Sequence, residues 1–111
     1  MSQPLCFHTS QNLSSGALSF SLDLDYPVRL SQVLIHFSTN VTETVKVIYD
    51  SGMGSNYDTE LDSTDLSSEA NYVFRPSGRC VIGREDALKI TCTNANGTGT
   101  AYVTVIVQKE G

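Results

Sequence analysis

Several residue types are scarce in this chain of 111 residues, and each scarcity excludes a class of protein. Tryptophan is absent, and there are only three prolines and three cysteines. No run reaches the roughly 18 apolar residues that a membrane helix needs, so we expect no membrane partner. The first residues lack a basic stretch and a long apolar core, which argues against a signal peptide and favours a product of the cytoplasm.

Basic side chains are also few. Seven Lys and Arg stand against twelve Asp and Glu, which gives a formal net charge of −5. A surface that binds phosphate groups needs positive charge, so we expect no nucleic-acid partner. Good helix formers are scarce as well, because alanine and glutamate occur only five times each.

The three cysteines do not form a metal-binding or redox motif. Cys6, Cys80 and Cys92 are an odd number without a C-x-x-C pair. Each lies in an apolar or alternating stretch, so we expect buried free thiols rather than a disulfide. Zinc would need clustered Cys and His ligands, and none occur. The sequence gives no reason to expect a bound metal or cofactor.

Hydroxyl and β-branched residues are abundant, with 14 Ser, 11 Thr, 10 Val and 5 Ile. Apolar residues recur with a period of two, which is typical of strands. We expect about eight strands, at residues 4–9, 16–25, 28–39, 43–50, 71–75, 79–82, 87–93 and 100–108. The polar run 59–66 fits an edge strand or an irregular crossover. The sequence therefore predicts an all-β protein, one antiparallel, jelly-roll-like β-sandwich domain over residues 1–111.

Three local features refine this prediction. The apolar phase changes near Ser31 and Gln32, which indicates a bulge. The stretch 94–99 is rich in Asn and Gly and predicts a hairpin turn. Residues 63–71 are the only place where a helical turn or two would fit.

The last strand carries apolar residues in both phases. Tyr102 and Ile106 share one phase, and the alternating residues Val103, Val105 and Val107 share the other. This pattern favours either a central strand or a strand whose second face is buried by a neighbouring subunit.

Catalytic motifs are absent, so we expect no enzyme. His8 and His36 fall in predicted strands, and an active site would require one of them to lie beside a carboxylate in a pocket. Six carboxylates concentrate between Asp50 and Glu69. They fit either a calcium-binding loop or a solvated acidic edge that opposes aggregation.

Basic residues cluster immediately after the acidic segment. Four of the seven, including Lys89, fall within residues 75–89. Such segregated charge suits head-to-tail contacts between identical subunits or docking on a larger assembly, although ordinary surface charge explains it too. We take as candidate interface residues Arg75, Arg79, Arg84, Tyr102, Val103, Val105 and Val107.

Two segments carry a resemblance to a known class of protein. The first is RLSQVLIHFSTNVTETVKV at residues 29–47, followed by Asp50-Ser-Gly and Tyr57-Asp58. The second is DALKITCTNANGT at residues 86–98, followed by the strand at 101–108. Together they resemble small structural proteins of tailed-phage virions, some of which coat the capsid as decoration or cement proteins. Residues 83–86 (GRED) depart slightly from the usual turn of that class.

This resemblance implies a β-sandwich with a structural role in the virion. The implied partners are the major capsid protein or another virion protein, and further copies of the chain, with a trimer favoured. The same segments also resemble carbohydrate-binding jelly-roll modules, which use exposed aromatic side chains for stacking. A tail or baseplate component is the other alternative.

Overall fold

The computed structural model describes residues 4–110 and contains nine strands and one short helical turn. In chain order the elements are β1 (Pro4–Asn12), β2 (Leu18–Leu22), β3 (Val28–Val41), β4 (Thr44–Asp50), the 3-10 turn η1 (Ser55–Tyr57), β5 (Thr59–Asp65), β6 (Glu69–Phe74), β7 (Val81–Ile82), β8 (Ala87–Cys92) and β9 (Thr100–Lys109).

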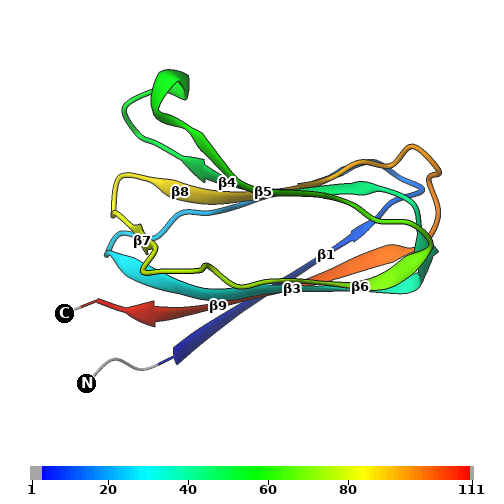
Figure 1. Cartoon of the computed structure of the whole chain (residues 1–111), viewed down its shortest axis with the longest axis horizontal. Coiled ribbons are helices and arrows are strands. Elements are labelled where there is room, and N and C mark those ends of the chain that lie inside the picture. Colours follow the sequence, from blue (N-terminus) through cyan, green and yellow to red (C-terminus); the bar gives the residue numbers. More distant parts are fainter. Residues whose placement is uncertain (1–3, 111) are drawn as a thin grey trace.

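The strands form two facing antiparallel sheets (Figure 1). Sheet A has the order β1-β9-β3-β6, with the two-residue β7 added beside β3, and sheet B has the order β2-β8-β4-β5. The pairs β4–β5, β3–β6, β2–β8 and β1–β9 are successive rungs of one antiparallel ribbon that wraps into two layers. This is the jelly-roll arrangement. The predicted fold class is confirmed, and the ninth strand is β5, in the polar run that fitted either an edge strand or an irregular crossover.

Alternating side chains build the core between the sheets. β2 buries Leu18 and Leu22 and exposes Ser19 and Ser21, as its period-two pattern predicts. The largest fully buried side chain is Phe37 of β3, surrounded by valines, leucines and isoleucines of both sheets. Each such buried side chain stabilises the fold by about 1.5–3 kcal/mol relative to exposure. The hydroxyl residues of the strands largely occupy the solvent phase.

Several local predictions are confirmed. The register of β3 against β9 shifts between Leu30 and Gln32, where the bulge was expected. β5 is an edge strand of sheet B, as its polar sequence indicated.

Two other local predictions are wrong. The turn at 94–99 does not join a hairpin, because β8 pairs in sheet B and β9 in sheet A; it carries the chain from one sheet to the other. The only helical turn among the described residues is η1, whereas residues 63–71 include the end of β5 and the start of β6.

The structure corrects the expected interface on β9. This strand lies between β1 and β3, so it is a central strand. Val103, Val105 and Val107 point into the core and are almost fully buried. They cannot contact a partner, because their apolar surface already packs against sheet B. Of the residues assigned to this interface, only Tyr102 lies on the solvent side of β9.

The cysteines are free thiols, but only one is fully buried. Cys92 lies in the core, where burial, helped by the charge of Glu43, raises its pKa to about 11. Cys80 is half-buried, and burial raises its pKa as well. Cys6 is exposed on β1, contrary to expectation, because β1 turns this phase to solvent.

The described part of the chain contains no helix long and apolar enough to cross a membrane.

Candidate functional site

The outer face of sheet A is the first candidate site. Register places Ser10, Tyr102, His36 and Asn71 in one row across four strands. The next row holds His8, Thr104, Leu34 and Val73, and Ile106 follows on β9. Val73 and Tyr102 are each 51% exposed. This face therefore presents apolar surface to solvent, from Tyr102 on the central strand β9 and from Val73 on the edge strand β6.

Tyr102 separates two shallow hollows on this face. One, of 350 Å³, is lined by residues of β3, β6 and β9, including Leu34, His36 and Val73. The other, of 300 Å³, lies between β1 and β9 beside His8. Both histidines are held by side-chain hydrogen bonds of 3.0 Å, His8 to Thr104 and His36 to Asn71. These bonds join neighbouring strands and fix the polar groups around the tyrosine.

The outer face of sheet B differs in character. Its register rows contain serine, threonine, lysine and glutamate side chains, and Ile48 is the only large apolar member. Lys46 and Glu60 form an ion pair of 3.5 Å across β4 and β5, with both side chains well exposed. Exposed ion pairs of this kind add little stability. The two faces of the sandwich are therefore chemically distinct.

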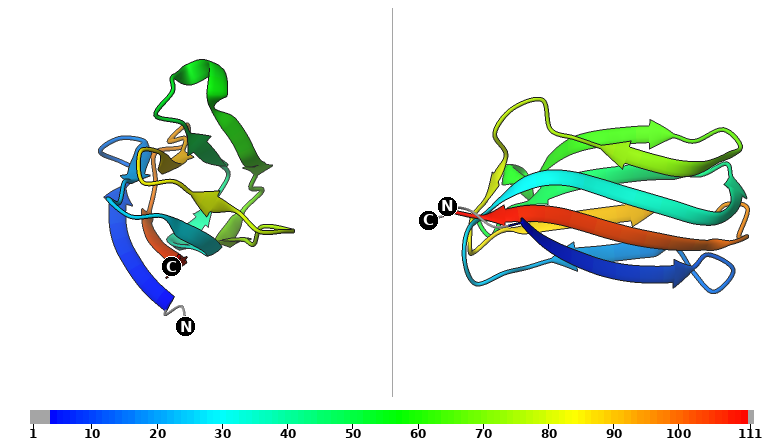
Figure 2. Two further views of the ribbon diagram at one scale, coloured as in Figure 1. Left: turned by 90° about the vertical axis from the view of Figure 1, so that its left-hand side faces the viewer. Right: turned by 90° about the horizontal axis from the view of Figure 1, so that it is seen from below.

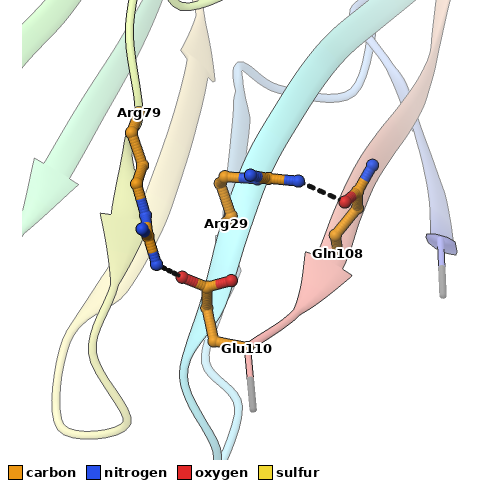
Figure 3. A network of polar contacts seen from close by, with 4 residues as sticks. All are labelled: Arg29, Arg79, Gln108 and Glu110. Carbon is orange, nitrogen blue, oxygen red and sulfur yellow. Dashed lines mark hydrogen bonds and ion pairs between the residues drawn. The ribbon is translucent and has the colours of Figure 1, made fainter. Parts of the chain in front are cut away.

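The three predicted interface arginines do not form one patch. Arg75 and Arg79 lie together on the connection between β6 and β7, whereas Arg84 lies in the turn before β8 beside Glu85 and Asp86. Figure 3 shows Arg79 paired with Glu110, and Arg29 donating to Gln108. The predicted basic region is therefore split, and its Arg75–Arg79 part borders a pocket.

That pocket, which we call the arginine pocket, is lined by Leu61 and residues 74–80 and measures 380 Å³. Leu61, Phe74 and Cys80 are partly buried against the core and supply apolar surface. The Nε of Arg75 donates to the side-chain oxygen of Gln32 at 3.2 Å, which orients the guanidinium group. The pocket thus combines an apolar floor with a cationic rim.

A loop between β4 and β5 forms a projecting arm, residues 51–58, which contains η1 (Figure 1). Its base is fixed by Asp86, which accepts hydrogen bonds from the Tyr49 hydroxyl and from the Gly52 amide. Both bonds favour the ionised carboxylate and lower the pKa of Asp86. The same contact raises the pKa of Tyr49. Asp86, the residue immediately before β8, therefore holds the base of the arm in place.

Sequence reasoning missed Glu43, which is only 3% exposed between β3 and β4. Its carboxylate accepts bonds from the Thr93 hydroxyl (2.7 Å) and from the amides of Ala95 (2.8 Å) and Asn96 (2.9 Å). Burial opposes ionisation, but these donors outweigh it and lower the pKa of Glu43. The sequence gives no signal for this role, because Glu43 and residues 93–96 are far apart in the chain and meet only in the folded structure.

The acidic segment does not gather into a metal site. Among residues 4–110 no group of three or more Cys, His, Asp or Glu side chains is arranged to hold an ion. Several of the carboxylates instead bond within the fold. Asp62, for example, accepts from Tyr72 (2.5 Å) and Thr64 (2.8 Å), and burial together with this bond raises the pKa of Tyr72.

Comparison with known proteins shows a shared fold. No protein-family model matches the chain, and no curated protein matches its sequence. The crystal structure of PirA is similar with a TM-score of 0.51 and 12% identity, over 94% of this chain and 92% of that one.

Two further structures were matched at lower similarity. The Drosophila NLP core, described in connection with pentamer formation and histone binding, has a TM-score of 0.45 and 13% identity, over 91% and 95% of the two chains. A chain from the structure of the infectious bursal disease virus Gt strain matches with a TM-score of 0.42 and 14% identity, over 98% of this chain but 38% of that one. Among these matches, the likeness to PirA supports the all-β fold.

Proposed function

We propose that this chain is a non-enzymatic structural protein of a virion, of the decoration or cement type, which binds a shell of coat protein. The observation that carries the proposal is the exposed apolar patch on the outer face of sheet A, formed by Val73 and Tyr102 with Leu34 and Ile106 on the same face, set against the polar face of sheet B. The jelly-roll topology supports it, since capsid proteins commonly use this fold. The resemblance of residues 29–58 and 86–108 to phage virion proteins points the same way.

The proposed mechanism is mechanical. A rigid sandwich that lays one sheet across neighbouring coat subunits removes apolar surface from water in both partners. Because the protein binds the assembled shell and not the separated subunits, binding raises the free energy needed to take the shell apart. Attachment as a trimer would multiply this effect through several simultaneous contacts.

The test is co-sedimentation with assembled shells. Val73→Asp and Tyr102→Ser alter exposed side chains on the outer face of sheet A, so both should fold normally and weaken binding by at least about tenfold. Ser21→Asp, on the exposed face of sheet B, is the matched control and should bind like the wild type. A wild-type protein that does not sediment with shells would overturn the proposal.

A carbohydrate-binding module is a second candidate, and one observation favours it. Tyr102 stands between two hollows, with Asn71 and His36 in its register row as hydrogen-bonding groups. Exposed aromatic rings beside polar groups suit sugar rings. Binding to a glycan array that Tyr102→Ser abolishes, by a protein that ignores coat shells, would favour this candidate.

A further inference from the structure

We propose that copies of this chain bind one another head to tail, with the arm of one copy seated in the arginine pocket of the next. The contact uses a surface separate from the apolar residues of sheet A, so it goes beyond the proposed function. It identifies a second copy of the chain as the occupant of the pocket.

The arm carries exposed apolar side chains that nothing in its own chain covers. Met53 is 75% exposed and Tyr57 is 62% exposed. Tyrosine and methionine are enriched at protein interfaces, where they often act as anchors in pockets. Two such side chains on one short loop are a compact candidate anchor.

The arm is also held in shape before binding. The amide of Ser51 donates to Asp58 at 2.8 Å, which closes the loop at its base. Gly52 donates to Asp86 at 2.8 Å and packs directly against the backbone of Glu85. A preformed loop loses little conformational entropy when it docks, which favours binding.

Charge complementarity selects the occupant. No Lys or Arg occurs between Lys46 and Arg75, so the arm is negatively charged through Asp58, and Asp50 at the end of β4 adjoins it. At the pocket rim Arg79 is paired with Glu110, so Arg75 supplies the available positive charge. Within residues 4–110 no carboxylate forms an ion pair with Arg75, so its charge is available to a partner. A loop with one carboxylate and two exposed apolar side chains therefore matches an apolar pocket whose rim carries the charge of Arg75.

The two surfaces point in different directions on the molecule. In the end-on view of Figure 2 the arm projects at the top, and the connection between β6 and β7, which forms the pocket, projects to the right. One copy therefore offers its arm and its pocket to different neighbours. Such a heterologous contact closes into a ring or continues as a filament.

Mixing of two variants is the decisive experiment. The arm variant M53S/Y57S keeps an intact pocket, and the pocket variant R75E/R79E keeps an intact arm. Light scattering after size exclusion should show an oligomer for the wild type and a monomer for each variant alone. The two variants mixed should form a 1:1 heterodimer and nothing larger, since only one functional contact remains.

Two controls make the result specific. Lys89→Glu changes a charge on the outer face of sheet B, and Val73→Asp changes an exposed apolar residue of sheet A; both should leave the oligomer intact. If Val73→Asp abolishes the oligomer while the arm variant does not, the copies associate through sheet A and the proposal is wrong. A monomeric wild type, or variants that do not complement each other, would also overturn it.

Failure here is distinguishable from failure of the proposed function. Sedimentation with coat shells depends on the outer face of sheet A, whereas the mixing experiment contains no coat protein. If the wild-type protein binds shells but is monomeric, the proposed function stands and the head-to-tail contact is refuted.

Discussion

Glu43 shows how one side chain can join two distant connections. It lies between β3 and β4, yet its carboxylate binds the hydroxyl and amide groups of residues 93–96, where the chain crosses from sheet B to sheet A. Hydrogen bonds to a buried charge are stronger than neutral ones, and a buried group without its partners is costly. Glu43 therefore stabilises this end of the sandwich.

We predict that Glu43→Gln lowers the free energy of unfolding by about 2 kcal/mol at pH 7. Because the pKa of Glu43 is lowered from its ordinary value of 4.5 on folding, its stabilising effect is fully present above that value. The effect is lost as the pH falls through the lower pKa of the folded state. Urea unfolding across this range should show wild type and variant converging in acid. A difference that does not depend on pH would contradict the prediction.

At the scale of elements, the arm depends on a close contact at its base. A β-carbon on Gly52 would lie 2.2 Å from the carbonyl oxygen of Glu85, so the two segments would have to separate. Gly78, in another exposed loop, has open space around it. The two glycines therefore form a matched pair for the same substitution.

We predict that Gly52→Ala destabilises the protein by about 1–3 kcal/mol through overpacking. Gly78→Ala should be neutral or stabilising by up to about 1 kcal/mol, because alanine restricts the unfolded chain. Denaturant unfolding measures both values. Amide exchange should also accelerate across residues 51–58 in Gly52→Ala alone. Equal effects of the two substitutions would show that the contact with Glu85 does not matter.

Elements with strict alternation could be predicted from the sequence, but their partners could not. The pattern of β2 gave its buried face, and the phase change at Ser31 and Gln32 gave the bulge. The turn at 94–99 was located correctly, yet the prediction of a hairpin was wrong. Asn and Gly permit the positive φ of Gly97 and Gly99, but they do not decide which strand pairs next. The partner strands decide it, because β8 pairs with β2 and β9 pairs with β1.

At the scale of the whole molecule, the sequence indicated segregated charge but not where it would lie. The fold separates Arg84 from Arg75 and Arg79 and turns the valines of β9 inward, so the predicted interface reduces to Tyr102 and the two pocket arginines. The missing information was three-dimensional, because residues 61 and 74–80 form a pocket only when β5 and β6 lie at neighbouring edges of the two sheets.

Self-association gives a last prediction, on thermal stability. A contact made only by folded copies stabilises them by mass action, by about 2.7 kcal/mol at a hundredfold excess over Kd. For a domain of this size we therefore expect the wild-type Tm to rise by about 5 °C or more over a hundredfold increase in protein concentration. The pocket variant R75E/R79E should show a constant Tm, because it has no contact to populate. Added salt should reduce the rise for the wild type, since the arm and the pocket rim carry opposite charges. Scanning calorimetry at several concentrations measures these effects, and a Tm that rises equally in both proteins would exclude the arginine pocket as the site of contact.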